Sequence, residues 1–245
     1  MAVILPFEAA FYRNHGIAAT FVGHPLMDGT PFAPGPEAYA ERLARPPVIG
    51  LLPGSREGEI ERLLPVLLDA AGILRNRIPG VRFLVSHSPS IRSARFLAAL
   101  PRGRSLPDVE VVTGSLSDLY RRATLVVAAS GTVTLETAIA GVPMVVVYKV
   151  SPLSYRLGKA LIRVDHISLV NLIAEKRLVP ELIQDDASPE GIAGTVTGLL
   201  SDPEGLLRMQ KALLSLRERL GRSGASGRTA EIALKLSAGA RGGEP

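Results

Sequence analysis

The chain of 245 residues contains no cysteine and no tryptophan, and only 4% of its residues are aromatic. Without cysteine the chain forms no disulfide and no thiolate metal site, which fits a reducing cytoplasm. Proteins that bind single-stranded nucleic acid stack the bases on aromatic rings, so the scarcity of these rings argues against that class. The net charge of +5 comes from scattered arginines rather than a basic run, and we expect no nucleic-acid partner.

Long apolar runs and metal-ligand patterns are also lacking. No stretch approaches the roughly 20 apolar residues of a membrane-spanning helix. The opening Met1-Ala2-Val3-Ile4-Leu5 has no basic segment before it, unlike a signal peptide. No cluster of histidine, aspartate and glutamate has the spacing of a metal site. We therefore predict a cytoplasmic protein that needs neither a metal nor another cofactor.

Apolar strand patterns alternate with helical patterns along most of the chain. This alternation predicts an α/β fold, a Rossmann-like doubly wound parallel sheet, because parallel strands need helical crossovers. Proline and glycine are frequent in residues 30–47, which predicts a linker. We expect the main domain at 48–200, C-terminal helices at 201–236 and a frayed tail at 237–245.

Residues 1–29 predict a strand, a helix and a second strand, but no neighbouring strands to cover them. Parallel sheets are normally buried on both faces, so these residues are interpreted as the remnant of a second Rossmann-like domain that lies mostly upstream. The alternative is that they extend the edge of the main sheet.

Two turns have the character of anion sites. The segment Leu125–Tyr148 predicts a strand, the turn Ser130-Gly131-Thr132, a helix carrying Glu136, and another strand. Open α/β sheets bind ligands at the carboxyl ends of their strands, where helix N-termini favour anions. Glu136 could accept hydrogen bonds from ribose hydroxyls or could simply complement the helix dipole, and the segment alone does not separate these readings.

The second turn, Pro53-Gly54-Ser55-Arg56, follows the predicted strand at Val48–Leu52. Gly54 permits close backbone approach, Ser55 offers a hydroxyl, and Arg56 offers a guanidinium fork that suits phosphate. The turn matches neither the P-loop nor the G-x-G-x-x-G pattern, so neither a nucleoside triphosphatase nor an ordinary NAD enzyme is indicated.

Two further polar residues are candidates. Asn171 lies among apolar residues and must find hydrogen-bond partners if it is buried; locally it suggests the cap of a short helix beginning at Leu172, or a residue that orients a ligand. His24 follows a predicted strand and precedes the predicted linker, so it could face a cleft between two domains, although a strand-end histidine is more often structural.

Several segments together resemble lipid-A-disaccharide synthase, an inverting glycosyltransferase family of the two-Rossmann-domain (GT-B) type. They occur in the family's order and comprise Ile4-Leu5-Pro6-Phe7-Glu8, Phe21-Val22-Gly23-His24-Pro25-Leu26, Leu52-Pro53-Gly54-Ser55-Arg56, Ala129-Ser130-Gly131-Thr132 with Leu135-Glu136, Pro143-Met144-Val145-Val146 and Ser168-Leu169-Val170-Asn171-Leu172.

The resemblance implies transfer of 2,3-diacylglucosamine from UDP to 2,3-diacylglucosamine 1-phosphate, giving lipid A disaccharide 1-phosphate and UDP. It implies that Gly54, Ser55 and Arg56 hold the diphosphate and that the turn Ser130-Gly131-Thr132 supports it. Glu136 would bind the ribose, and Asn171 would be a donor-site residue rather than a cap. It also implies peripheral association with the anionic surface of the inner membrane and leaves the oligomeric state open.

One departure from the family pattern matters. The family has a further domain upstream, with an aspartate proposed as the general base, and no residue here matches that aspartate. We therefore expect the donor-binding half, with no turnover by this chain alone. The alternatives are a UDP-binding module without turnover, or another GT-B glycosyltransferase or UDP-sugar epimerase.

Overall fold

The computed structural model describes residues 1–29, 34–90, 96, 109–151 and 166–241. Its elements, in chain order, are β1 (Ala2–Val3), α1 (Glu8–Asn14), β2 (Thr20–Phe21), the short 3-10 helix η1 (Pro25–Met27), α2 (Pro36–Leu43), β3 (Val48–Leu52), α3 (Glu57–Arg77), β4 (Arg82–His87), β5 (Val109–Thr113), α5 (Ser117–Arg122), β6 (Leu125–Ala129), α6 (Thr132–Ile139), β7 (Met144–Tyr148), α8 (Leu169–Ala174), β8 (Glu181–Ile183), α9 (Pro189–Leu200), α10 (Pro203–Arg219) and α11 (Ala225–Arg241).

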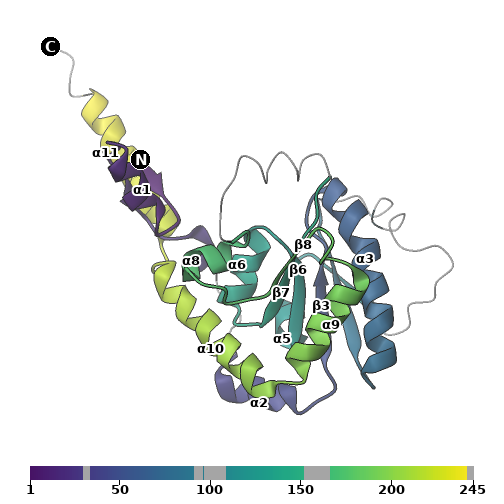
Figure 1. Ribbon diagram of the computed structural model, residues 1–245. Helices are drawn as coiled ribbons and strands as arrows, with labels where there is room; N and C mark the ends of the chain where they lie inside the picture. The colour runs from purple at the N-terminus through teal and green to yellow at the C-terminus, as the bar shows by residue number, and fades with distance from the viewer. Residues whose placement is uncertain (30–33, 91–95, 97–108, 152–165, 242–245) are drawn as a thin grey trace. The chain divides into compact units, whose positions relative to one another are not determined.

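Six parallel strands form the main sheet in the order β5-β4-β3-β6-β7-β8 (Figure 1). From β3 the chain first adds strands on one side and then crosses to add β6, β7 and β8 on the other. The order therefore reverses between β3 and β6, which is the switch point where doubly wound sheets bind ligands. The predicted doubly wound parallel sheet is confirmed.

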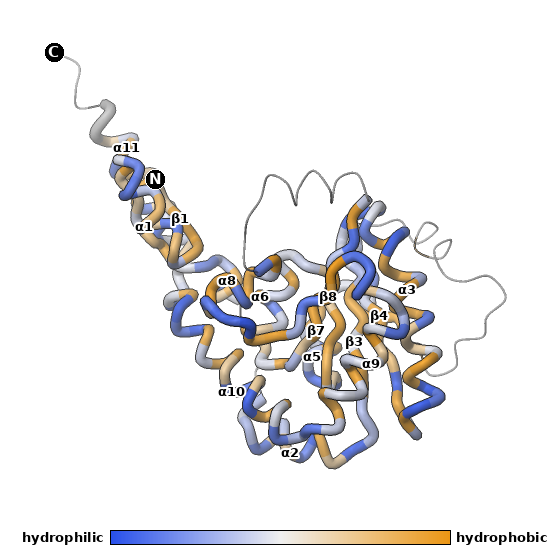
Figure 2. Tube along the Cα trace, in the orientation of Figure 1, coloured by the Kyte–Doolittle hydropathy of each residue, from blue (hydrophilic) through white to orange (hydrophobic). Residues whose placement is uncertain are grey.

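Helices cover both faces of this sheet. Alternate strand residues such as Ile49, Leu51 and Val127 pack with the buried side of α3 and with α9 in one apolar core. On the other face lies α5, whose Leu119 comes so close to Gly50 that a Cβ there would stand 2.8 Å from it. Figure 2 shows the central strands as hydrophobic and α3 as alternating along its length. Burial on both faces explains why β3, β6 and β7 are almost continuous apolar runs.

The segment predicted as a linker differs in the structure. Within residues 30–47, Pro36 begins α2, where the missing N–H of proline costs nothing. Tyr39 of this helix is fully buried, and its hydroxyl donates a 2.7 Å hydrogen bond to the carbonyl of Thr124. The prolines of residues 30–47 predicted a linker, but Pro36 starts a helix, and this helix packs against the main domain. The helical residues 237–241 likewise differ from the tail expected there.

The chain divides into two compact units, one of residues 32–214 and one that joins residues 1–31 with 215–245. In the smaller unit, β1 and β2 form a separate two-stranded parallel sheet. The alternative that these strands extend the edge of the main sheet is therefore wrong.

Asp28 ties the two ends of the chain together within the smaller unit. Its carboxylate accepts hydrogen bonds from the backbone N–H groups of Gly224, Ala225 and Ser226 and from the Ser226 hydroxyl, at 2.6–3.0 Å. It thus caps the N-terminus of α11 from almost two hundred residues away. These hydrogen bonds, above all those from Ser226, hold the pKa of Asp28 well below its usual range.

We expect Asp28→Ala to destabilise the smaller unit at pH 7, because the first N–H groups of α11 lose their acceptor. A carboxyl group whose pKa is lowered on folding stabilises the fold above its unfolded pKa, near 4, and this contribution is lost as the pH falls further. Urea unfolding should therefore show that the free energy of unfolding of Asp28→Ala is lower than that of wild type at pH 7, and that this difference is smaller at pH 3. Asp28→Asn, which keeps an acceptor oxygen, should lie between them; equal stability of all three would contradict the capping role.

Candidate functional site

A pocket of about 450 Å³ opens at the carboxyl ends of β3, β4, β5 and β6, at the switch point of the sheet. We call it the strand-end pocket. Seven of the nine residues singled out from the sequence line it, namely Gly54, Ser55, Arg56, Ser130, Gly131, Thr132 and Glu136. The two turns, almost eighty positions apart, therefore meet in one pocket, as the parallel arrangement predicts.

The turn after β3 is held in place by Glu59 in the first turn of α3. One carboxylate oxygen accepts the backbone N–H groups of Ser55 and Arg56 at 3.1 and 3.3 Å, and the other pairs with the Arg56 guanidinium at 2.9 Å. Gly54 has a φ of +109°, and a Cβ there would stand 2.4 Å from the Glu59 carboxylate. Only glycine fits this position.

Arg56 remains available to a ligand despite this ion pair. Its side chain is 84% exposed and lines the strand-end pocket. An exposed pair three residues apart on a helix contributes little to stability and is easily exchanged for a stronger partner. A phosphate bearing more charge than one carboxylate would be such a partner.

The turn after β6 offers backbone donors to the same pocket. Gly131 is the N-cap of α6, and among the described residues the N–H groups of Thr132 and Val133 have no acceptor. The Ser130 hydroxyl donates to the carbonyl of Ile167 at 3.4 Å, while the Thr134 hydroxyl donates to Gly131 at 2.7 Å. These contacts order the turn, and the free N–H groups at the start of α6 belong to residues that line the strand-end pocket, where they suit an anion.

Glu136 lies one turn farther along α6, half-buried at the pocket wall. Burial raises its pKa above the usual value for a glutamate. No hydrogen bond or ion pair joins its carboxylate to any residue within the described part of the chain. A partly desolvated acceptor without a partner is suited to a ligand that brings hydroxyl donors. A role limited to complementing the dipole of α6 does not by itself account for the position of Glu136 at the pocket wall.

Asn171, for which the family resemblance implied a donor-site role, is not among the residues that line the strand-end pocket. Its side chain is fully buried in α8. The amide nitrogen donates to the Val179 carbonyl and to Glu181, and the amide oxygen accepts the N–H groups of Leu178 and Val179, all at 2.8–2.9 Å. These hydrogen bonds join α8 to Val179 and to Glu181 of β8, so the Asn171 amide helps to position α8 against β8. The cap of α8 is Ser168, whose hydroxyl accepts the Asn171 N–H.

His24 is also outside the strand-end pocket and belongs to the smaller unit. Its side chain is buried, and its Nδ1 accepts the backbone N–H of Leu26 at 3.2 Å, which caps η1. Burial lowers the pKa of His24, although the nearby Glu8 carboxylate opposes this shift. The geometry supports the structural reading of this histidine.

Sequence reasoning assigned no role to the residues that follow β4 and β5. Ser86, His87 and Ser88 at the end of β4, and Gly114 and Ser115 after β5, also line the pocket. The Ser90 hydroxyl donates to the carbonyl of Ser55 at 3.1 Å, so the β4 loop contacts the β3 turn. The available signal was the shared edge of the sheet, because every polar residue that follows a parallel strand lies there.

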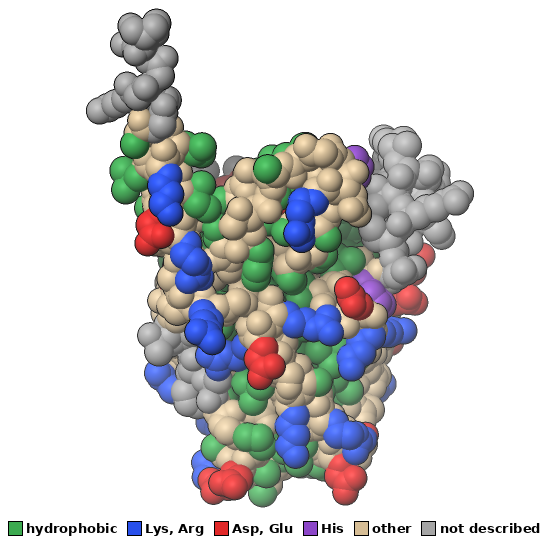
Figure 3. All heavy atoms as spheres, turned by 90° about the vertical axis from the view of Figure 1, so that its left-hand side faces the viewer, with side chains coloured by type: hydrophobic (Ala, Val, Ile, Leu, Met, Phe, Trp, Pro, Cys, Tyr) green, Lys and Arg blue, Asp and Glu red, His purple; other side chains and the backbone are tan. Residues whose placement is uncertain are grey.

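Neither a membrane span nor a metal cluster is found in the part of the chain that the structure covers. No described helix combines the length and apolar composition that a crossing requires. No group of three or more His, Asp or Glu residues in the described ranges could hold a metal ion. On the face shown in Figure 3, basic and acidic side chains are interspersed.

Comparison with known proteins identifies close relatives. Lipid-A-disaccharide synthase of Geobacter metallireducens is 44% identical over 239 residues, 96% of this chain and 62% of that protein. The enzyme of Nitrosococcus oceani is 43% identical over 243 residues, 98% of this chain and again 62% of the relative. The chain therefore spans less than two thirds of the length of these relatives.

A solved structure with the same fold is the spinosyn rhamnosyltransferase SpnG complexed with thymidine diphosphate. It superposes with a TM-score of 0.56 at 18% identity, over 88% of this chain and 52% of that one. The family model described as lipid-A-disaccharide synthetase matches residues 1–236. With this match and these identities, the chain belongs to the lipid-A-disaccharide synthetase family.

Proposed function

We propose that this chain carries the UDP-sugar site of a lipid A disaccharide-forming glycosyltransferase. The donor is UDP-2,3-diacylglucosamine, the acceptor is 2,3-diacylglucosamine 1-phosphate, and the products are lipid A disaccharide 1-phosphate and UDP. The observation that carries the proposal is the meeting of the Gly54–Arg56 turn and the Ser130–Thr132 turn in one pocket at the switch point of the sheet.

The chemistry of the pocket suits a departing nucleoside diphosphate. Negative charge grows on the diphosphate as the glycosidic bond breaks, and a guanidinium and helix N–H groups stabilise that charge. Arg56 and the first turn of α6 supply these groups from two sides. The thymidine diphosphate bound to SpnG, which shares the fold, is a ligand of the same chemical class.

Glu136 would accept the ribose hydroxyls of UDP. Its unpaired carboxylate is partly desolvated, which costs free energy. Each hydroxyl that donates to it offsets part of this desolvation free energy, and a hydrogen bond to a charged group contributes about 1.5–3 kcal/mol. Substituting glutamine removes the charge while keeping the shape.

We expect Glu136→Gln to weaken UDP binding and to stabilise the free protein at neutral pH. Folding raises the pKa of Glu136, so the protonated carboxyl group stabilises the fold below the unfolded pKa, and this contribution is lost as the pH rises through the folded pKa. At neutral pH the ionised carboxylate therefore destabilises the fold, and glutamine, which has no charge, does not. Calorimetry with UDP and with 2′-deoxy-UDP should show that wild type prefers the ribose form and that the variant discriminates less. Thermal unfolding at pH 7 and pH 4 should show the variant's advantage only at pH 7. A variant that binds UDP normally would refute the ribose role.

The reaction itself is tested by supplying both acylated sugars and following disaccharide and UDP. The sequence predicts no turnover by this chain alone, so the assay should be run with and without the first part of a full-length relative added in trans. UDP binding without product would favour a binding module, and product from this chain alone would refute that reading. Stronger competition by simple UDP-glucosamine than by the acylated donor would favour another UDP-sugar enzyme.

We also propose cytoplasmic location with peripheral attachment to the anionic inner membrane, where the acylated substrates reside. The net charge of +5 supports this attraction, which salt would screen. Sedimentation with anionic vesicles at low and high salt tests it.

A further inference from the structure

A second pocket lies at the opposite edge of the main sheet, where β3 and β4 begin. Its volume is about 310 Å³, and it is lined by Val48 and Arg82, the first residues of these strands. Since the strands are parallel and the strand-end pocket lies at their other ends, the two pockets are separate, and no described residue lines both.

Guanidinium groups dominate this second pocket. Among the described residues, one acidic side chain, Glu41, lines it, and we call it the arginine pocket after the five arginines there: Arg42, Arg45, Arg82, Arg121 and Arg122. They come from α2 and its C-terminal end, from β4 and from the last turn of α5. Like charges brought together in this way repel one another unless anions balance them.

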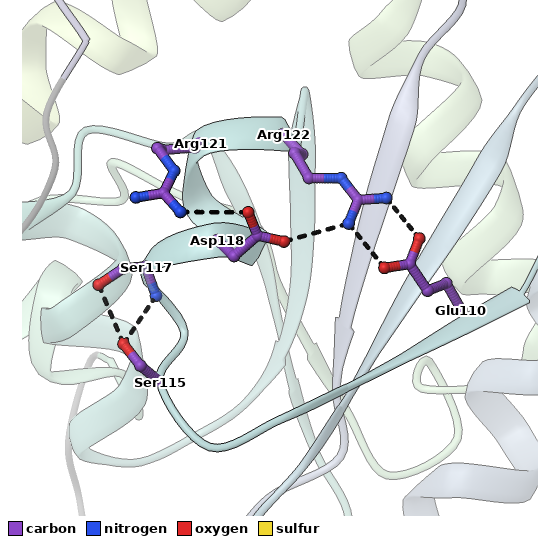
Figure 4. Close-up of polar contacts among 6 residues, drawn as sticks. All are labelled: Glu110, Ser115, Ser117, Asp118, Arg121 and Arg122. Atoms are coloured by element: carbon purple, nitrogen blue, oxygen red, sulfur yellow. Dashed lines mark hydrogen bonds and ion pairs between the residues drawn. The ribbon is translucent and has the colours of Figure 1, made fainter.

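Three of the arginines are already bound within the protein. Arg42 donates to the carbonyls of Tyr120 and Ala123 and so caps the end of α5. Figure 4 shows Arg122 between Asp118 and Glu110 and Arg121 on the other oxygen of Asp118. Among the described residues, these two carboxylates and Glu41 are fewer than the five guanidinium groups, so positive charge is in excess within this part of the chain.

The excess lies on Arg45 and Arg82, which are exposed. Neither side chain has a hydrogen bond or an ion pair with another described residue. The pKa of Glu110 is lowered chiefly by its hydrogen bond from Arg122, and the charge of Arg82 adds only a small effect. Both side chains therefore keep their donors for a ligand.

Hydrogen bonds hold the frame around these donors in place. Tyr39 anchors α2 through its 2.7 Å hydrogen bond to Thr124. The Arg42 guanidinium lies 5.8 Å from the centre of the Tyr39 ring, and the N–H of Val48 donates to the Thr124 hydroxyl. A frame already ordered before binding reduces the entropy that a ligand must overcome.

We propose that the arginine pocket binds a phosphate-bearing anion, either a soluble polyphosphate or the phosphate of a lipid headgroup. Phosphate presents several acceptor oxygens that match the guanidinium fork, and proteins commonly use arginine for bidentate binding of phosphate. The site is independent of the nucleotide pocket and of the reaction proposed there.

Two probes distinguish the sources of the phosphate. Inorganic pyrophosphate is titrated calorimetrically in saturating UDP, which occupies the strand-end pocket, and again with the Arg56→Ala variant. Vesicles of phosphatidylglycerol and phosphatidylcholine are compared with phosphatidylcholine alone in sedimentation. Wild type should bind at least one probe saturably, and Arg45→Ala/Arg82→Ala should weaken that binding about tenfold or more while leaving UDP affinity unchanged.

The matched control is Lys176→Ala/Arg177→Ala, which removes two exposed positive charges away from the arginine pocket. It should bind both probes like wild type. Equal weakening in both double variants would mean general charge attraction and would overturn the proposal, as would no saturable binding of either probe. Circular dichroism and thermal unfolding check that the variants fold. If UDP fails to bind, only the proposed UDP-sugar site is refuted. The proposal for the arginine pocket is still tested, because the comparison of the two double variants does not require UDP.

Discussion

Replacing Arg56 by alanine is expected to weaken UDP binding by about 1.5–3 kcal/mol, the contribution of a hydrogen bond to a charged group, which is roughly a 10- to 150-fold loss of affinity. The guanidinium is the strongest hydrogen-bond donor to phosphate in the strand-end pocket. Its ion pair with Glu59 is exposed, so Arg56 can exchange Glu59 for a phosphate. Isothermal titration of UDP measures the effect directly.

The geometry of Arg56 makes a further distinction. Arg56→Lys keeps the charge but loses the fork, so its affinity should lie between that of wild type and that of the alanine variant. Arg177→Ala removes an exposed charge outside the pocket and should leave UDP binding unchanged. Unaltered UDP affinity in Arg56→Ala would remove the diphosphate role and with it the main support for a UDP-sugar site.

The second large effect is expected at Asn171, on stability. Asn171→Ala leaves the N–H groups of Leu178 and Val179 without their acceptor and takes a donor from Glu181. Each buried donor left unsatisfied costs about 1–3 kcal/mol, so the loss of both acceptor contacts should lower the free energy of unfolding by about 2–6 kcal/mol. Urea unfolding measures the loss, and Asn76→Ala, at an exposed position of α3, should change stability by no more than about 0.5 kcal/mol.

The same variant separates a positioning role from a ligand contact. If Asn171 only positions α8, the folded variant should bind UDP nearly as wild type does at low temperature. A stable Asn171→Ala protein that has lost UDP binding would restore the donor-site role that the family resemblance implies. Ser130 donates to Ile167, just before α8, so a small loss of affinity is compatible with positioning.

Glu181 is the centre of this network and escaped notice in the sequence. It accepts the N–H groups of Ile167 and Ser168, the Ser168 hydroxyl and the Asn171 amide. Burial alone would raise its pKa, but these hydrogen bonds outweigh that effect and lower it. Its strand, β8, has only three half-buried residues at the sheet edge, and such a strand leaves no apolar run to detect.

The sequence by itself determined the parallel sheet and the meeting of its two turns. Buried strands must be apolar on both faces, and the carboxyl ends of parallel strands share one edge, so local patterns at Val48–Leu52 and Leu125–Ala129 suffice. The family followed from the order of short motifs along the chain.

The tertiary structure alone decided which polar residues serve the fold and which face the solvent. Asn171 and His24 are used inside the protein, Asp28 caps a helix far away in the sequence, and α2 packs where proline suggested a linker. The arginine pocket likewise gathers residues from 42 to 122. Hydrogen bonds and charge pairs depend on distances between segments remote along the chain, and no local pattern records those distances.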